Sequence, residues 1–290
     1  MRPVRTVVVP VAGLGTRVLP ATKTIPKELL TVVDRPLIDY VYEEAREAGC
    51  EHFIFVTGRG KGAIEDYFDH GFELEATLEK KGKKDVLEDL IARKPPAGAV
   101  SYTRQQAPLG LGHAVWCARH LVGDEPFAVI LPDDVVQAEK SCLAQMVDAY
   151  NEVGGNLVAI EEVPQEKTNK YGVVAPDGPI DGPLVKMSGM VEKPTPAEAP
   201  SNLAIIGRYI LQPEIFPLLE KQGAGAGGEI QLTDSMATLM TSQDFHGFQF
   251  QGARHDCGDK LGWLKANIAM GLARDEFAAD LRVYLKSIVS

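Results

Sequence analysis

Short apolar runs that alternate with helix-like stretches constrain the fold of this chain more than any other feature. The runs lie at 6–11, 53–57, 127–131 and 157–160, and they are rich in valine, isoleucine and phenylalanine. Such runs are typical of strands buried on both faces of a parallel sheet. The first 160 residues therefore predict a doubly wound α/β sheet, in which ligands bind at the carboxyl ends of the strands.

The rest of the chain follows a less regular pattern. Strands are expected at 171–174, 184–192, 203–211 and 245–251. The highly charged stretch 61–94 and the final segment 259–290 are expected to be helical, with Asp259 as the cap of the final segment. The sequence contains no internal repeat and no linker, so we expect one continuous domain.

Apolar side chains recur at helical spacing in the final segment. They are Leu261, Trp263, Leu264, Ile268, Leu272, Phe277, Leu281, Tyr284, Leu285 and Ile288. This pattern indicates either packing on the core of the same chain or a helix-mediated contact between copies of the chain. The pattern alone does not decide between the two.

Composition and charge exclude several classes of protein. The chain has 290 residues and a formal net charge of -10, whereas nucleic-acid-binding proteins are usually basic. No apolar stretch approaches the roughly 18 residues of a membrane span, and the first strand is too short for a signal-peptide core. The four cysteines are scattered without metal-ligand spacing. We therefore expect a cytoplasmic protein that binds neither nucleic acid nor membranes.

The glycine-rich loop after the first strand is the first candidate site. Residues 12–28 read AGLGTRVLPATKTIPKE. Gly13 and Gly15 let the backbone turn sharply and approach a ligand, and Arg17 and Lys27 supply fixed positive charge. Backbone amides combined with cations suit a polyphosphate. The loop matches neither the dinucleotide fingerprint, which needs a third glycine, nor a Walker A loop. A plain strand-to-helix turn with surface cations is the alternative.

This loop resembles the signature loop of the sugar-1-phosphate nucleotidyltransferases. Its TKTIPKE form is most similar to that of the bacterial UTP–glucose-1-phosphate uridylyltransferases. The resemblance implies a nucleotidyltransferase fold with a Rossmann-like, mixed but mainly parallel sheet. It also implies that Ala12, Gly13 and Gly15 contact the nucleotide. Arg17 and Lys27 would hold the triphosphate and the leaving pyrophosphate.

A second glycine-rich turn, 105–112, is a candidate for base recognition. Gln105 offers a side-chain amide, and Gly110 exposes backbone groups just before a helix that starts near His113. A glycine-rich helix entry would explain the same residues without any ligand. The resemblance implies that Gln105 and Gly110 contact the uracil of UTP. A histidine at a helix start is more often structural than catalytic, so His113 is assigned no role.

Aspartates follow two strands that should end at the same edge of the sheet. Asp133 and Asp134 come directly after 127–131, and Asp256 follows 245–251. Adjacent carboxylates repel each other unless a cation or solvent offsets their charge. Mg²⁺ prefers one or two carboxylates together with phosphate oxygens, although an aspartate pair that caps a turn is the alternative. The resemblance implies Mg²⁺ at Asp133 and Asp256, with Asp134 as a partner near the base or ribose.

The sequence VEKP at 191–194 is the candidate sugar site. Successive strand residues point to opposite faces, so Glu192 and Lys193 can reach one ligand only at a strand end or bulge. An isolated surface ion pair is the alternative. The resemblance implies that Glu192 binds sugar hydroxyls, that Lys193 binds the sugar phosphate, and that Gly172 lets the hexose approach the backbone.

These motifs occur in the order of the family, which implies a nucleotidyltransferase domain at 1–258 and a helical segment of the same domain at 259–290. The implied reaction is the transfer of a uridylyl group from UTP to glucose 1-phosphate by in-line attack. A homo-oligomer, a dimer or a tetramer, is also expected. Two alternatives remain: a sister transferase (thymidylyl, or N-acetylglucosamine), and a non-catalytic regulatory relative that binds nucleotide sugars. The joint presence of Arg17, Lys27 and Asp133 with Lys193 and Asp256 argues against the second.

Overall fold

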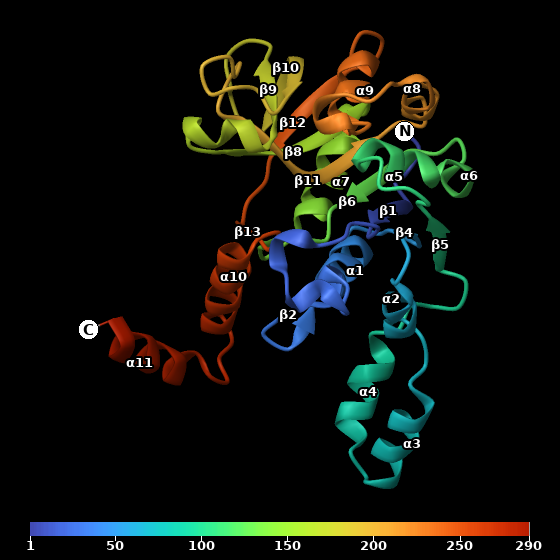
Figure 1. The fold of residues 1–290 in the computed structure, drawn as a ribbon, viewed down its shortest axis with the longest axis vertical. Helices are drawn as coiled ribbons and strands as arrows, with labels where there is room; N and C mark the ends of the chain where they lie inside the picture. Colours follow the sequence, from blue (N-terminus) through green and yellow to red (C-terminus); the bar gives the residue numbers. More distant parts are fainter. Residues whose placement is uncertain (290) are drawn as a thin grey trace.

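A nine-stranded sheet in the order β5-β4-β1-β6-β11-β8-β12-β10-β9 forms the centre of the molecule (Figure 1). The structure is a computed structural model that describes residues 1–289. The strands are β1 (Thr6–Pro10), β4 (His52–Thr57), β5 (Val100–Arg104), β6 (Phe127–Ile130), β8 (Asn156–Glu162), β9 (Gly172–Pro176), β10 (Leu184–Glu192), β11 (Leu203–Leu211) and β12 (Phe245–Gln249).

The sheet is mixed but mainly parallel, which confirms the predicted fold class. Within the described residues, β10 and β11 run against the other seven strands. β5, β4, β1 and β6 are joined in parallel, as are β8 and β12. The carboxyl ends of these parallel strands therefore share one edge, where ligands bind in folds of this kind.

Helices cover both faces of the sheet. α1 (Leu37–Glu47) and α7 (Cys142–Val153) pack on one face, while α5 (Leu111–Cys117), α6 (Arg119–Val122), α8 (Ile215–Lys221) and α9 (Leu232–Leu239) pack on the other. A short hairpin pairs β2 (Thr31–Val32) with β3 (Arg35–Pro36). In residues 1–289, no helix has both the length and the apolar character needed to cross a membrane.

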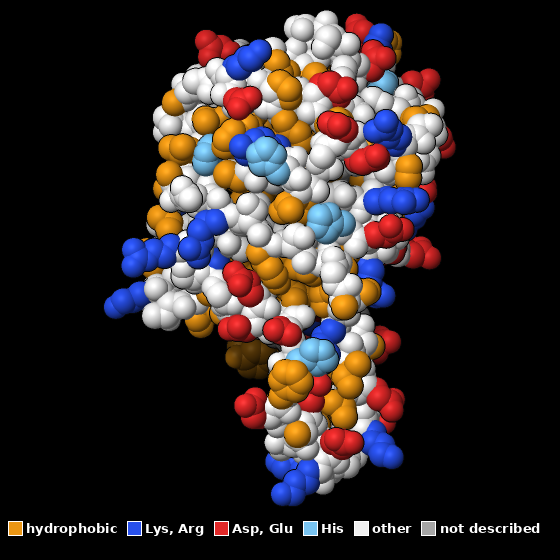
Figure 2. Space-filling view, turned by 90° about the vertical axis from the view of Figure 1, so that its right-hand side faces the viewer, with side chains coloured by type: hydrophobic (Ala, Val, Ile, Leu, Met, Phe, Trp, Pro, Cys, Tyr) orange, Lys and Arg blue, Asp and Glu red, His pale blue; other side chains and the backbone are white. Residues whose placement is uncertain are grey.

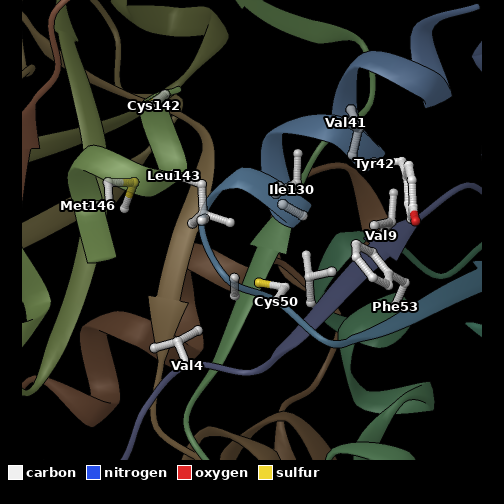
Figure 3. Packing of buried hydrophobic residues seen from close by; sticks show 14 of the residues in the cluster. Val4, Val9, Val41, Tyr42, Cys50, Phe53, Ile130, Cys142, Leu143 and Met146 are labelled. Atoms are coloured by element: carbon white, nitrogen blue, oxygen red, sulfur yellow. The ribbon is translucent and has the colours of Figure 1, made fainter. Parts of the chain in front are cut away.

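Side chains alternate along β1, so this strand contributes to the hydrophobic core on each face of the sheet. Val7 and Val9 join the core under α1, and Val8 joins the core on the opposite face. Figure 3 shows Val9 beside Val41 and Tyr42 of α1 in the first core. Because β1 is buried on both faces, the glycine-rich loop at its carboxyl end starts from a rigid position.

The charged stretch 61–94 forms three helices rather than one continuous helix. They are α2 (Gly62–Tyr67), α3 (Phe72–Lys80) and α4 (Lys84–Ala92). Gly82, with φ +67°, reverses the chain between α3 and α4, because this backbone conformation favours glycine. The α3–α4 hairpin projects from the body and carries both acidic and basic side chains (Figure 2).

The final segment also consists of two helices, α10 (Lys260–Leu272) and α11 (Ala278–Val289). Asp259 caps α10 as expected, since its carboxylate accepts a hydrogen bond from the backbone of the first turn. Trp263 Nε1 donates to the carbonyl oxygen of Thr31 at 2.9 Å. α10 is thus fastened to the body, whereas α11 extends away from the sheet (Figure 1).

A small antiparallel sheet brings two distant aspartate motifs together. β7 (Asp134–Gln137) follows β6 directly and pairs with β13 (Ala253–Asp256). In this register Asp134 lies opposite Asp256. The pairing places Asp133, at the carboxyl end of β6, beside the end of β13.

Candidate active site

A cavity of about 650 Å³ lies at this edge of the sheet, and half of the residues given a site role from the sequence line it. Its lining includes Arg17, Asp133, Gly172, Glu192, Lys193 and Asp256. Lys27 contacts Asp133 from outside the lining. Ala12, Gly13, Gly15, Gln105 and Gly110 do not belong to the lining of the described cavity. The candidate metal and sugar residues thus converge at one cavity together with Arg17, whereas the glycine-rich loop and the candidates for base recognition do not line it.

Lys27 and Asp133 form an ion pair at the floor of the site. Lys27 Nζ donates to Asp133 Oδ2 at 2.7 Å, and the guanidinium of Arg17 lies 3.6 Å from the same oxygen. Burial disfavours the Asp133 carboxylate, but the charge and the hydrogen bond of Lys27 outweigh burial and hold the pKa of Asp133 below its usual range. Both groups therefore carry their charge at neutral pH.

The loop that carries Lys27 is held by a second, buried ion pair. Lys61 Nζ donates to Glu28 Oε2 at 2.7 Å, which ties the loop to the start of α2. Gly15 adopts φ +66°, and a Cβ there would lie 3.1 Å from Lys27 Cβ. Gly15 is thus required by the backbone and by the close approach of Lys27. A Cβ at Gly13 would make only ordinary contact, at 3.8 Å.

Asp133 and Asp256 face each other across Gly258. The amide of Gly258 donates to Asp256 Oδ1 at 2.9 Å. A Cβ on Gly258 would lie 2.9 Å from Arg17 Nη2, 2.9 Å from Asp256 Oδ1 and 3.1 Å from Asp133 Oδ2, so glycine lets the guanidinium and both carboxylates approach one point. Within residues 1–289, no cluster of three or more histidine, cysteine or acidic residues offers a complete metal site. Two carboxylates at one cavity match the incomplete donor set from which Mg²⁺ is usually held when phosphate oxygens complete it.

Asp134 lines the cavity, and both of its carboxylate oxygens bond within the protein; its suggested role near the base or ribose stays a prediction. Its Oδ2 accepts from the amide of Gly207 at 3.2 Å, and its Oδ1 accepts from Arg254 Nε at 2.7 Å. Arg254 also lies 3.4 Å from Glu161 and 4.0 Å from Asp256. Asp134 therefore ties β7 to β11 and β13.

A buried arginine that sequence reasoning missed fixes the turn around Asp133. Arg208 donates to both carboxylate oxygens of Glu44 at 2.8 Å. It also donates to the carbonyl oxygens of Leu131, at 3.2 Å, and of Asp134, at 2.5 Å. These carbonyls flank Asp133 on either side. The signal was present in the sequence, because Arg208 is a lone charge inside the apolar strand LAIIGRYIL.

Glu192 and Lys193 end β10 in a conformation that lets both reach the cavity. Lys193 has φ +47°, a left-handed conformation that is uncommon for a residue other than glycine. Its Nζ lies 3.1 Å from Glu192 Oε1, and its amide donates to the carbonyl oxygen of Tyr171 at 2.9 Å. Glu192 and Lys193 thus lie at a strand end and line one cavity; their action on a sugar stays a prediction.

Thr233, at the start of α9, is a further residue that the sequence did not suggest. Its Oγ1 donates to Glu192 Oε2 at 2.7 Å. Glu192 is therefore held by Lys193 on one oxygen and by Thr233 on the other. A Cβ on Gly172 would lie 3.1 Å from Thr233 Oγ1 and 3.3 Å from Glu192 Oε2, so a larger residue would press on this arrangement.

The glycine-rich turn at 105–112, the candidate for base recognition, packs tightly against the segment 229–233. Gly110 adopts φ +100°, and a Cβ there would lie 2.7 Å from Glu229 Cβ. Ile230 donates its amide to the carbonyl oxygen of Leu109 at 2.7 Å and accepts from the amide of Gly112 at 2.8 Å. Because the same segment continues to Thr233, it connects the turn at 105–112 to the residue that bonds to Glu192.

Comparison with known proteins agrees with this geometry. The model of the nucleotidyl transferase family matches residues 6–270. A UTP–glucose-1-phosphate uridylyltransferase of Komagataeibacter xylinus is 50% identical over 265 residues, which cover 91% of this chain and 93% of that protein.

Two solved structures share the fold at similar identity. A UTP-bound UGPase from Acinetobacter baumannii matches with a TM-score of 0.89 and 44% identity, over 97% of this chain and 98% of that one. A UDP-glucose pyrophosphorylase complexed with UDP-glucose matches with a TM-score of 0.83 and 43% identity, over 93% of this chain and 100% of that one. The chain therefore belongs to the nucleotidyl transferase family, and within it to the UTP–glucose-1-phosphate uridylyltransferases.

Proposed function

We propose that the cavity between β6, β10 and β13 is the active site in which this enzyme transfers a uridylyl group from UTP to glucose 1-phosphate. A phosphate oxygen of the sugar attacks the α-phosphorus of UTP, and the bond to the bridging oxygen breaks. Pyrophosphate leaves with the electron pair, and UDP-glucose is the other product. The observation that carries this proposal is the convergence of the Lys27–Asp133 pair, Asp256 and the Glu192–Lys193 pair at one cavity.

Each charged group has a role that follows from its position. Arg17 and Lys27 bind the triphosphate and stabilise the pyrophosphate as it departs, while Ala12, Gly13 and Gly15 supply backbone groups. Lys193 aligns the sugar phosphate, and Glu192 accepts hydrogen bonds from sugar hydroxyls. No covalent nucleophile is needed, because the reaction depends on orienting two anions that repel each other.

Mg²⁺ fits the pair of acids in this site. Asp133 and Asp256, whose carboxylates approach the same point beside Gly258, would hold the ion, and a bound ion would supply positive charge to phosphate oxygens. The oxygen-only donor set and the small number of carboxylates favour Mg²⁺ over a transition metal.

A substrate panel tests the proposed function. With glucose 1-phosphate as acceptor, we expect pyrophosphate release to be fastest with UTP, weaker with dTTP, and slower by orders of magnitude with ATP or GTP. Discrimination against dTTP should be partial, because uracil and thymine share the edge that Gln105 faces. Preference for a purine nucleotide, or for N-acetylglucosamine 1-phosphate over glucose 1-phosphate, would contradict the assignment.

We also propose a cytoplasmic location for the enzyme. The four cysteines, Cys50, Cys117, Cys142 and Cys257, are all free thiols. Free thiols are the rule in a reducing compartment.

The exposed face of α11 supports a contact with a second copy of the chain. Val283, Tyr284 and Ile288 are 69%, 61% and 58% exposed, which is unusual for three apolar side chains on one helix. We expect Val283→Glu to reduce the particle mass measured by light scattering. The matched control is Val86→Glu on α4, where the valine is 55% exposed. An unchanged mass for Val283→Glu would argue against this interface.

A further inference from the structure

In the side-chain amide of Gln105, the nitrogen is hydrogen-bonded to the protein and, among the described residues, the oxygen is not. Its Nε2 donates to the carbonyl oxygen of Gly110 at 3.0 Å and lies 3.1 Å from His113 Nδ1. A carbonyl oxygen can only accept, so the nitrogen of the amide, and not its oxygen, must face Gly110. Both N–H groups of the amide are then directed into the protein. Within residues 1–289, no protein donor bonds to Gln105 Oε1.

His113 can accept this hydrogen bond only as a neutral ring with its proton on Nε2. Burial, followed by the positive charge of Arg119, lowers the pKa of His113 below its ordinary value, so the neutral form prevails at pH 7. The ring stacks on Trp116 with centroids 5.7 Å apart. Arg119 covers the same tryptophan at 3.5 Å. This packing holds Nδ1 in place beside Gln105.

The orientation of the amide has a consequence for the base. Uracil presents an N3–H donor on its Watson–Crick edge, whereas the N3 of cytosine is an acceptor. A fixed acceptor oxygen on Gln105 therefore pairs with uracil and faces a lone pair of cytosine. We propose that His113 is a positioning residue that fixes the Gln105 amide with its oxygen toward the base, and thereby makes the site select uracil over cytosine. This inference rests on the proposed function, in which Gln105 faces the base.

The carbonyl oxygen of Gly110 and Nδ1 of His113 together hold the Gln105 amide in one orientation. A flipped amide would place Oε1 against Gly110 O, which is a repulsive acceptor pair, and it could bond to His113 only if the ring moved its proton from Nε2 to Nδ1. Without the acceptor of His113, a single contact would oppose the flip, and a cytosine could then bind the exposed amide nitrogen. One hydrogen bond of this kind corresponds to roughly a tenfold change in an equilibrium constant.

Two isosteric variants of His113 test the inference. His113→Leu removes the acceptor, and His113→Asn places an amide oxygen at the position of Nδ1. We expect His113→Leu to lower the ratio of kcat/KM for UTP to that for CTP by about tenfold or more. The loss should appear mainly in KM for UTP, with KM for glucose 1-phosphate little changed. His113→Asn should restore most of the ratio.

A mutant cycle with Gln105→Ala separates positioning from general packing. If His113 acts through Gln105, then His113→Leu changes the UTP/CTP ratio in the wild-type background and not in the Gln105→Ala background. Should the leucine variant fail to fold, His113→Ala takes its place in the same cycle. An unchanged ratio in the single variant, or equal losses in both backgrounds, would overturn the inference. Failure of the wild-type enzyme to use UTP would instead overturn the proposed function.

Discussion

Replacing Lys27 with methionine should lower kcat by about 100- to 1,000-fold and leave KM for glucose 1-phosphate nearly unchanged. Methionine keeps the length and the apolar stem of the side chain, and it removes the charge. We expect that charge to matter most as pyrophosphate departs, so its loss should raise the barrier more than it weakens substrate binding. Steady-state kinetics with both substrates varied would measure the effect.

The same substitution has a second expected consequence, at Asp133. The Lys27 ammonium lies 2.7 Å from Asp133 Oδ2 and offsets the burial that would otherwise raise the pKa of this carboxyl. Without it, the pKa of Asp133 should rise. A carboxylate needed for activity is lost as the pH falls through its pKa, so the acidic limb of the pH–activity profile should move to higher pH.

Lys193→Met is the matched comparison for Lys27→Met. Lys193 carries the same charge at the sugar side of the cavity, so its loss should raise KM for glucose 1-phosphate more strongly than Lys27→Met does. Similar kinetic signatures for the two variants would contradict separate roles for the two lysines. A nearly wild-type kcat in a folded Lys27→Met enzyme would reduce Lys27 to a structural partner of Asp133.

The sequence was sufficient to predict the parallel half of the sheet and the convergence of the main motifs. Buried strands such as 127–131 are recognisable by composition alone, and strand order then brings their carboxyl ends together. The direction of β11 could not be predicted, because a strand that is apolar on both faces looks the same in either direction. The pairing of β7 with β13 was equally hidden, since four residues are too few to show a period.

Contacts between side chains that are far apart in the chain could not be predicted from the sequence. Lys27 and Asp133 are 106 positions apart. The sequence indicates a phosphate ligand for Lys27 and Mg²⁺ for Asp133, and it does not indicate that the two side chains form an ion pair. Thr233 bonds to Glu192 from a helix that carries no recognisable motif. The amide of Gln105 lies against the ring of His113, a contact that no spacing in the sequence indicates. Each of these contacts depends on three-dimensional packing that no local pattern encodes.

Asparagine at Asp133 or at Asp256 should raise the Mg²⁺ concentration needed for half-maximal activity and lower kcat, each by about tenfold or more. Asparagine keeps the shape of the side chain and removes its charge. If both acids hold one ion, the two single variants should behave alike, and the double variant should be little worse than either. Initial rates measured over a Mg²⁺ series for all four enzymes would decide this.

Thermal stability without metal should distinguish the same two variants. Mutual repulsion alone would predict that removing either carboxylate leaves the fold as stable as before, or more so. The Lys27 contact reverses this expectation for Asp133, because Asp133→Asn leaves a largely buried ammonium without its anion, at a cost of roughly 2 kcal/mol. Asp256 has a side chain that is 39% exposed and lies 4.0 Å from Arg254, so Asp256→Asn should change the melting temperature little. If the two variants have the same kinetic defects but different melting temperatures, the two acids share a metal site and Asp133 also anchors the loop that carries Lys27. Additive kinetic losses with an unaltered Mg²⁺ dependence would show that the two acids do not share an ion.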